Sequence, residues 1–392
     1  MNNQQTLRLG IIGIGNIGSA HASAVSGGLI PHLELTALCD SDPSRAEALR
    51  LQYPTVPVFL SSDELIASGL CDAVVVSTPH YDHPPIATAA LRAGLHVLSE
   101  KPLGVYCSAA RETCRVAKES GKVYAVMFNQ RASNLYREAR RIVRSGELGE
   151  LKRSIWIVTN WYRKQCYYDS GDWRATWSGE GGGVLMNQAP HNLDLFQWIC
   201  GMPVSVRAEC HEAHFHSIEV EDDATLFFRY ANGATGLFVT STGDFPGTNR
   251  LEITGTLGKL VIENKTLTLT RLSMDEREYR MTADGVKNPL SVTTLEHEPY
   301  QGHHRVLEQF ARHVLFGDDL IAHGEEGLCE LTLSNAAYLS AWQGGSWIDL
   351  PMDDAAYLQA LEERISHSSS EKHTHSTLSS HEGYSDRWNT NW

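Results

Sequence analysis

Short apolar runs alternate with stretches of helical spacing from Leu7 onward. The runs read as strands over residues 7–13, 33–40, 57–60, 71–79, 95–102 and 122–129, and the first is followed by a helix-compatible run of small residues, NIGSAHASAVSG. Regular alternation of strands and helices predicts a parallel, doubly wound sheet with right-handed crossovers. The first third of the chain is therefore expected to be an α/β domain.

After about Gly149 the pattern changes to longer strands. These are expected over residues 151–163, 203–213, 224–242, 249–264 and 266–272. Asn232 and Gly233 stand between two β-rich runs, which is a strong hairpin signal and predicts antiparallel pairing. Two amphipathic helices are then expected over residues 303–317 and 325–345, the second ending at Gly344 and Gly345.

The run GGGVLMNQAPHNLDLFQW carries three polar residues at steps of four and three: Asn187, His191 and Asp194. A helix would place them within roughly 60° of one another, on a single stripe. The rest of that helix is apolar, which predicts burial, and buried polar groups need partners. A core hydrogen-bond network and a functional pocket are both consistent with the stripe.

Composition narrows the classes of protein. The 392 residues suggest two domains, and 42% hydrophobic with 20% charged residues is typical of a folded soluble protein. A formal charge of −14 disfavours nonspecific nucleic-acid binding. No apolar run approaches ~18 residues and the first residues are polar, so we expect a cytoplasmic protein with no membrane segment. The eight cysteines form no C-x-x-C pair, which indicates neither a zinc ribbon nor a disulfide framework.

The end of the chain differs from the rest. The tail, residues 366–392, is rich in Ser and His and poor in apolar residues. It is expected to be flexible, or to dock on another surface through Trp388 and Trp392. Its histidines have irregular spacing without supporting Cys or carboxylates, so we predict no metal site.

The motif GIGNIG lies between the first strand and the first helix. Gly13 permits a tight turn, Gly15 allows the backbone to approach a pyrophosphate, and Gly18 lets helix and strand pack closely. The N-terminus of the helix, at Asn16 and Ile17, offers unpaired N–H groups to phosphates. Asp40 ends the second strand, where a carboxylate can bind the ribose diol and repel a 2′-phosphate, which favours NAD over NADP. The alternative is a glycine turn followed by an Asp helix cap.

Two later loops follow strands at the edge where α/β sheets bind ligands. The first, STPHYDHPP, offers Thr78, Pro79 and His83 as cofactor contacts, although histidines in such loops more often serve as loop or cap residues. The second, SEKPLG, carries Glu100 and Lys101. Lys101 is either a surface cation or a group for chemistry beside the nicotinamide, and the isomer of its bond to Pro102 is left open.

The segment from Asn160 to Gly183 is a long aromatic loop with cationic residues. Long structured loops are often functional, and aromatic faces with Arg or Lys suit a polyhydroxylated ring. Tyr162, Trp173 and Arg174 are the expected substrate contacts, and Arg163 with Lys164 suggests an anionic substituent. The alternative is a packing loop at a subunit interface.

Four motifs in this order, GIGNIGSAH, EKP, MFNQR and GGGVLMNQAPHNLD, resemble the glucose-fructose oxidoreductase, inositol dehydrogenase and MocA (Gfo/Idh/MocA) family over about Leu7 to Pro351. The resemblance implies a Rossmann domain over residues 1–129 and an α+β domain over residues 130–355 with a large open, mostly antiparallel sheet. Such sheets often join subunits, so we expect a homo-oligomer, a dimer or a tetramer. Substrates in the family are mostly sugars, cyclitols and their derivatives.

The resemblance also assigns residues. It implies cofactor contact at Asn129 and catalytic roles for Lys101 and His191. Where the family usually has Asp, this chain has Asn187, and an amide cannot hold a proton at neutral pH. The family's Lys-Asp-His relay therefore does not carry over whole. Asp194 is placed to buttress His191 or to bind a hydroxyl.

These observations lead to one hypothesis and two rivals. The first is hydride transfer from a secondary alcohol carbon of a sugar to NAD, with His191 accepting the hydroxyl proton and Lys101 hydrogen-bonding the same oxygen; histidine's ordinary pKa of about 6.5 suits it to this role. The second is redox-neutral glycoside hydrolysis with bound NAD, in which transient C3 oxidation permits elimination of the aglycone, followed by water addition and re-reduction. The third is a non-catalytic NAD-sensing protein.

Overall fold

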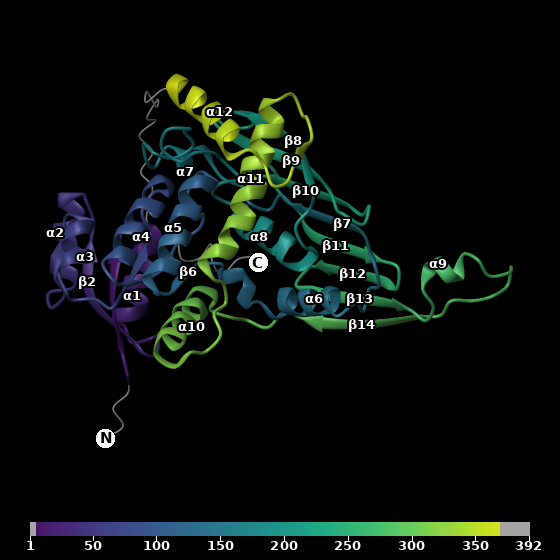
Figure 1. The fold of residues 1–392 in the computed structure, drawn as a ribbon, viewed down its shortest axis with the longest axis horizontal. Helices are drawn as coiled ribbons and strands as arrows, with labels where there is room; N and C mark the ends of the chain where they lie inside the picture. Colours follow the sequence, from purple (N-terminus) through teal and green to yellow (C-terminus); the bar gives the residue numbers. More distant parts are fainter. Residues whose placement is uncertain (1–4, 369–392) are drawn as a thin grey trace. The chain divides into compact units, whose positions relative to one another are not determined.

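The computed structural model describes residues 5–368, which form two compact units (Figure 1). The first unit extends to Ala132 and also includes Gln301–Leu331, whereas the second comprises Ser133–Tyr300 and the residues from Thr332 onward. The two tryptophans proposed to dock the tail, and most of the tail itself, lie outside the described residues.

A six-stranded parallel sheet forms the centre of the first unit. Its strands, in spatial order, are β3 (Val58–Phe59), β2 (Leu33–Cys39), β1 (Leu7–Ile12), β4 (Ala73–Val76), β5 (His96–Ser99) and β6 (Tyr124–Val126). The order reverses direction between β1 and β4, as in a doubly wound sheet. The predicted fold class is confirmed for this part of the chain.

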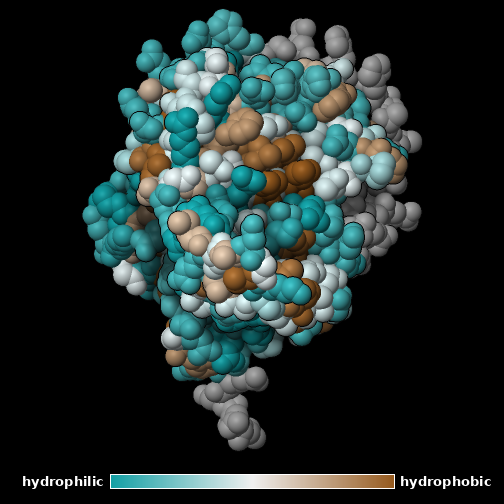
Figure 2. Space-filling view, turned by 90° about the vertical axis from the view of Figure 1, so that its right-hand side faces the viewer, coloured by the Kyte–Doolittle hydropathy of each residue, from teal (hydrophilic) through white to brown (hydrophobic). Residues whose placement is uncertain are grey.

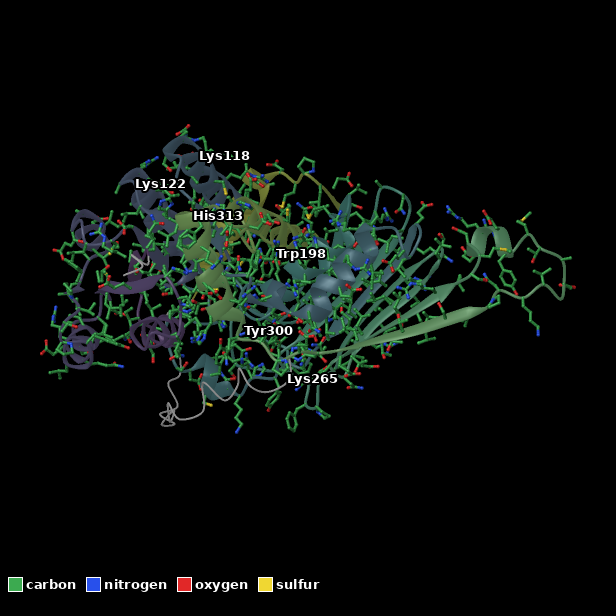
Figure 3. All side chains as sticks on the ribbon, turned by 90° about the horizontal axis from the view of Figure 1, so that it is seen from below. Lys118, Lys122, Trp198, Lys265, Tyr300 and His313 are labelled. Atoms are coloured by element: carbon green, nitrogen blue, oxygen red, sulfur yellow. The ribbon has the colours of Figure 1, made fainter. Side chains whose placement is uncertain are left out.

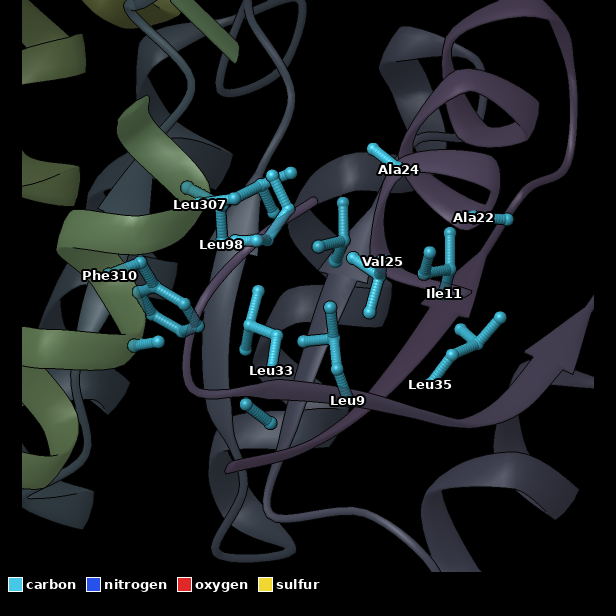
Figure 4. Packing of buried hydrophobic residues seen from close by; sticks show 14 of the residues in the cluster. Leu9, Ile11, Ala22, Ala24, Val25, Leu33, Leu35, Leu98, Leu307 and Phe310 are labelled. Atoms are coloured by element: carbon cyan, nitrogen blue, oxygen red, sulfur yellow. The ribbon is translucent and has the colours of Figure 1, made fainter. Parts of the chain in front are cut away.

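Helices connect these strands. They are α1 (Asn16–Ser26), α2 (Pro43–Gln52), α3 (Ser62–Ala67), η1 (His80–Asp82), α4 (His83–Arg92), α5 (Cys107–Ser120) and η2 (Asn129–Ala132), with α10 (Gly302–Phe316) and η3 (Gly324–Glu326) from the later segment. The sequence analysis placed this later segment in the second domain. The structure places it in the first because α10 buries Leu307 and Phe310 in the same core as Leu9 and Leu98 (Figure 4).

A nine-stranded sheet forms the second unit. Its strands, in spatial order, are β14 (Leu290–Glu296), β13 (Thr266–Leu272), β12 (Gly258–Glu263), β11 (Asn249–Gly255), β7 (Leu151–Val158), β10 (Thr235–Ser241), β9 (Glu221–Arg229), β8 (Ser205–Glu212) and β15 (Ile348–Asp349). Only β7 and β10 pair in parallel. The hairpin predicted at Asn232 and Gly233 joins β9 to β10 and is confirmed, whereas β14 and β15 were not predicted.

The helices of this unit are α6 (Asn134–Arg144), α7 (Gln165–Tyr168), α8 (Pro190–Cys200), α9 (Glu276–Tyr279) and α12 (Asp354–His367). The remaining helix, α11 (Gly327–Trp342), runs from the first unit into the second. Helices α6 and α8 pack on each other and against β13 and β7, respectively. The Arg140 guanidinium lies 4.3 Å from the ring centre of Trp198, which Figure 3 labels, and its Nε donates to the Trp198 carbonyl.

The helix predicted over the glycine-rich run is shorter than expected. It begins at Pro190, so Asn187 lies in the preceding turns, where its N–H donates to Gly183 O at 2.9 Å. Proline favours the first helical position because it has no N–H to bond within the helix. The prediction of one helical stripe from Asn187 to Asp194 is therefore wrong, although His191 and Asp194 do share the helix.

Candidate functional site

The predicted glycine turn is present between β1 and α1. Gly13 has φ +88°, and its N–H donates to Cys39 O at 2.8 Å. A Cβ on Gly13 would lie 2.7 Å from the Thr78 backbone N, and a Cβ on Gly18 would lie 2.0 Å from Gly13 O. The turn itself therefore requires glycine at both positions.

Gly15 has a different environment. It is the N-cap of α1, and a Cβ built there would meet no atom of the described residues within 4 Å. Thr78 lies in the loop that follows β4, at the same edge of the sheet as this turn. Its Oγ1 is buried and has no hydrogen-bond partner among residues 5–368. An open approach to a helix N-terminus and a buried hydroxyl without a partner there both fit the phosphates of a dinucleotide.

Asp40 lies at the end of β2, as predicted, and its carboxylate is buried. Its Oδ2 accepts from Ile14 N at 2.8 Å and from Arg45 Nη1 at 2.9 Å, and its Oδ1 accepts from Asp42 N at 3.0 Å. A carboxylate has about four acceptor positions, so it retains capacity for a ribose hydroxyl. The alternative interpretation of this stretch was an Asp helix cap. Such a cap exists at the start of α2, and the residue that forms it is Asp42, not Asp40.

His83 connects the two predicted cofactor loops. Its Nδ1 lies 2.7 Å from Pro102 O and its Nε2 lies 2.8 Å from Thr78 O. Burial lowers the pKa of His83. Because backbone oxygens lie within hydrogen-bond distance of both ring nitrogens, His83 shapes these loops, and contact between His83 and the cofactor stays a prediction. The Lys101–Pro102 bond, which the sequence left open, is cis.

A buried cluster surrounds Glu100, which the sequence analysis assigned to the cofactor. Glu100 Oε1 lies 2.9 Å from His21 Nε2, and Oε2 accepts from Lys101 N at 3.3 Å. Burial raises the pKa of Glu100, but the hydrogen bond and charge of His21 outweigh it and hold the pKa at about 2. His303 packs beside His21, with ring centres 5.7 Å apart, and Asn129 Nδ2 lies 3.3 Å from both nitrogens of His303. Burial lowers the pKa of His303 to about 4.

The sequence analysis missed two members of this cluster, His21 and His303. His21 stands three residues after Gly18, which places it one helical turn from the phosphate-binding end of α1. That spacing was a usable signal. His303 had none, because α10 was assigned to the other domain.

In the second unit, Asn187 belongs to a dense polar cluster. Its Nδ2 donates to Glu180 Oε1 and, at 3.3 Å, to the Tyr167 hydroxyl. The same hydroxyl lies 2.9 Å from Arg174 Nη1 and 3.2 Å from Gln188 Nε2. Sequence reasoning missed Glu180 and Tyr167, since neither lies at a regular spacing from Asn187.

The aromatic loop residues predicted to bind substrate are only partly gathered. The Arg174 guanidinium lies over the Tyr167 ring and over the Trp173 ring, 4.7 and 4.5 Å from their centres. Arg163 Nη1 donates to Trp161 O and Tyr162 O, which folds it back on its own loop.

Tyr162 faces elsewhere. It is 41% exposed and pairs with Phe245, with ring centres 5.2 Å apart. The structure thus joins Arg174 to the Asn187 cluster and leaves Tyr162 outside it. Substrate contact by Tyr162, Arg163, Trp173 and Arg174 stays a prediction.

Helix α8 carries His191 and Asp194, and both side chains are buried. Asp194 is fully buried and its Oδ1 accepts from Gln197 Nε2 at 3.0 Å. Between them in sequence, Asn192 Oδ1 accepts from Trp161 Nε1 at 3.0 Å, which ties α8 to the aromatic loop. Whether Asp194 buttresses His191 or binds a hydroxyl stays a prediction.

Glu221 holds the glycine-rich turn through hydrogen bonds to its backbone. It is fully buried and accepts from Gly183 N and Leu185 N, each at 2.9 Å, and from the Tyr338 hydroxyl at 2.7 Å. A Cβ on Gly183 would lie 1.9 Å from Glu221 O, so this close approach requires glycine. Burial raises the pKa of Glu221 to about 8, although its hydrogen bonds oppose the shift.

This raised pKa predicts a pH-dependent stability. The folded state holds the Glu221 proton up to pH near 8, whereas the unfolded chain releases it near the ordinary value of 4.5. The stabilisation that this proton provides is therefore complete below pH 4.5. The free energy of unfolding decreases as the pH rises toward 8, by roughly 2 kcal/mol between pH 6 and 8. Denaturant unfolding of the wild type and of Glu221→Gln across this range measures it. The variant should lose stability at every pH but show a flatter profile; equal slopes would contradict the assignment.

The described residues contain neither a group of possible metal ligands nor a membrane-spanning helix. Between residues 5 and 368, no three His, Cys, Asp or Glu side chains are grouped so as to hold a metal ion. Within the same range, no helix is both long enough and apolar enough to cross a membrane.

Comparison with known proteins identifies relatives of both parts of the chain. Residues 7–128 match a family model described as an oxidoreductase family with an NAD-binding Rossmann fold, and residues 136–261 match the GFO/IDH/MocA C-terminal domain. Inositol 2-dehydrogenase of Rhizobium meliloti is 26% identical over 340 residues, covering 86% of this chain and 97% of the relative. D-glucoside 3-dehydrogenase of Escherichia coli is 32% identical over 209 residues, but this match covers only 52% of this chain and 57% of the relative.

A solved structure has a similar fold. The WlbA dehydrogenase of Bordetella pertussis, in complex with NADH and UDP-GlcNAcA, superposes with a TM-score of 0.74 and 27% identity, covering 89% of this chain and all of that one.

Proposed function

The chain belongs to the Gfo/Idh/MocA family of oxidoreductases, and from this membership we propose that it oxidises a secondary alcohol carbon of a sugar, glycoside or cyclitol with NAD. The observation that carries the proposal is the glycine turn, where Gly15 leaves an open approach to the N-terminus of α1 and Thr78 Oγ1 lacks a partner among the described residues. The relatives named for inositol and glucoside dehydrogenation supply the substrate class.

Bound NAD supplies the hydride acceptor. Gly13, Gly15 and Gly18 shape the turn, and the N–H groups at Asn16 and Ile17 bind phosphate. Asp40 accepts hydrogen bonds from the ribose diol. A 2′-phosphate beside this carboxylate would bring two negative groups together, so the site favours NAD over NADP. Arg45 pairs with Asp40 and fixes its orientation.

The chain's own groups handle the proton. His191 accepts the proton of the substrate hydroxyl, and Lys101 donates a hydrogen bond to the substrate oxygen. Asn187 orients a hydroxyl through its amide. An anionic substituent on the sugar is supported by the exposed cationic loop residue Lys164, and by a structural relative in complex with UDP-GlcNAcA.

The experiment is a screen for NADH formation. Purified protein and NAD are incubated with inositols, aldoses, uronates and glycosides, and the absorbance of NADH is followed. Turnover of at least one member of the panel is expected. Tight NAD binding without turnover on the whole panel would instead favour the NAD-sensing protein considered above.

A second candidate is redox-neutral glycoside hydrolysis with NAD retained. The observation that favours it is Glu180, a buried carboxylate in contact with Asn187, because an elimination step requires additional acid and base groups. A chromogenic glycoside supplied without added NAD distinguishes the two reactions. Release of the aglycone without net NADH supports hydrolysis, and no release excludes it for that glycoside.

We also propose that the chain forms a homo-oligomer through the open face of the nine-stranded sheet. Phe227, Leu237 and Ile155 are neighbours across β9, β10 and β7, so they lie on the same face, and Phe227 is exposed. Figure 2 shows hydrophobic residues gathered on the side of the molecule where Figure 1 draws these strands. Light scattering should give the mass of a dimer or tetramer, reduced by Phe227→Asp; a monomeric wild type would contradict the proposal.

A further inference from the structure

We propose that Glu180 is a positioning residue for Asn187, and that the two side chains work as a pair of one carboxylate, at position 180, and one amide, at position 187. The inference rests on the proposed function for its catalytic consequence, but the pairing itself can be tested without activity.

The contacts of Asn187 fix the orientation of its amide. A carboxylate only accepts hydrogen bonds, so the group of Asn187 that faces Glu180 must be its NH2. One hydrogen goes to Glu180 Oε1 and the other points toward the Tyr167 hydroxyl at 3.3 Å. The amide cannot rotate by 180° without placing its oxygen against the carboxylate. Asn187 Oδ1 is therefore held as an acceptor with a fixed direction.

Burial and backbone hydrogen bonds hold Glu180 in place. The residue is 1% exposed, and its Oε2 accepts from Ala175 N at 2.6 Å. Its own N–H donates to Thr176 O at 3.0 Å. Ala175 has φ +53°, a conformation that is unfavourable for a side chain and is retained only where its surroundings impose it. Glu180 thus closes its loop and presents Oε1 to Asn187 from a fixed position.

Charged side chains lie around the pair formed by Glu180 and Asn187. Arg174 Nη1 donates to the Tyr167 hydroxyl, which also accepts from Asn187 Nδ2, so this cation is linked to the amide through the hydroxyl. The Glu180 carboxylate contacts the amide directly. The titratable and charged groups around the pair include Tyr167, Tyr168, Arg163 and Arg174. They also include Glu219, whose Oε2 accepts from Trp177 N in the same loop. An amide at position 187 therefore avoids placing a second carboxylate against Glu180.

The substitution Asn187→Asp would change this balance. Two carboxylates in hydrogen-bond contact cannot both be ionised, so the pKa of the pair rises above its value in the unfolded chain. The resulting loss of stability is present above the raised pKa and disappears as the pH falls through the unfolded pKa of about 4. Adding Glu180→Gln removes the repulsion, because the new amide can donate its NH2 to the carboxylate introduced at position 187.

The experiment is a double-substitution cycle of Asn187→Asp, Glu180→Gln and both together, with Glu209→Gln, an exposed residue of β8, as the matched control. Thermal unfolding is recorded at pH 5 and pH 8. The single Asn187→Asp should lower the Tm at pH 8 by about 2 °C for each unit of pKa shift. The deficit should be smaller at pH 5, and the double substitution should restore the Tm at pH 8.

Kinetics then test the positioning role. Glu180→Gln and Asn187→Asp should each lower kcat by about 100-fold, the effect of a group misplaced by about 1 Å, with the Kd for NAD unchanged. The double variant should regain at least tenfold, with a pH profile that gains the titration of the introduced carboxylate. A Tm deficit independent of pH, or a double variant no better than the sum of the singles, would overturn the pairing. Restored Tm with no substrate turned over by the wild type would contradict the proposed function and leave the pairing intact.

Discussion

Replacing His191 with Asn is expected to lower kcat by about 10²–10⁴-fold, the usual contribution of a positioned acid or base. In the proposed reaction the alcohol proton must leave as the hydride does, and an amide cannot accept it at neutral pH. His191 occupies the first turn of α8, behind Pro190, so its backbone is fixed by the helix start. The KM should change little, because the lost interaction is with the moving proton and not with the bound alcohol.

The measurement needs controls, since His191 is buried and its substitution can disturb packing. Thermal unfolding and NAD titration of the variant separate loss of folding from loss of chemistry. His211→Ala, at an exposed position of β8, is the matched control and should retain activity. If folded His191→Asn turns over substrate within threefold of the wild type, the assignment of the proton acceptor is wrong.

The sequence was informative where the determining interactions are local. The turn at Gly13 and the hairpin at Asn232 and Gly233 depend on the backbone freedom of residues that the sequence displays directly. The doubly wound sheet follows from the alternation of short strands with helices, since this order of elements is typical of an α/β fold with a parallel sheet. These features were predicted and are confirmed by the structure.

The sequence was less informative where partners are distant along the chain. Glu221 supports Gly183 from 38 residues away, and Glu100 pairs with His21 across 79 residues. No spacing rule connects such positions, because the sheet topology brings them together. The placement of α10 failed for the same reason: its apolar face predicts burial but does not name the core that receives it.

The helix start before His191 was a different kind of error. Periodicity alone extended the helix back to the glycines, although Pro190 is a recognised first helical residue. The turns before it are stabilised by Glu221 and by the backbone of Gly183, neither of which a periodicity argument includes. A helix that begins at Pro190 leaves Asn187 outside it.

The two glycines of the first turn should respond differently to alanine. A Cβ on Gly18 would lie 2.0 Å from the backbone oxygen of Gly13, so Gly18→Ala forces the turn apart and should destabilise the fold by about 3 kcal/mol or more. At Gly15 the backbone has φ −76° and a Cβ meets no described atom within 4 Å. Gly15→Ala should therefore unfold within about 1 kcal/mol of the wild type, the cost of a poorer helix cap.

NAD binding should be sensitive to Gly15→Ala although the stability of the fold is not, because the Cβ of an alanine at position 15 would enter the space through which a phosphate reaches the N-terminus of α1. Losing one hydrogen bond to a charged group is worth about 1.5–3 kcal/mol, so Gly15→Ala should weaken the Kd for NAD by about 10–150-fold while the apo protein stays folded. Titration calorimetry with NAD, combined with thermal unfolding of both variants, measures the two effects separately. A stable Gly15→Ala variant with wild-type affinity would mean that the pyrophosphate does not pass this residue, and the cofactor would then have to be held by contacts other than the turn.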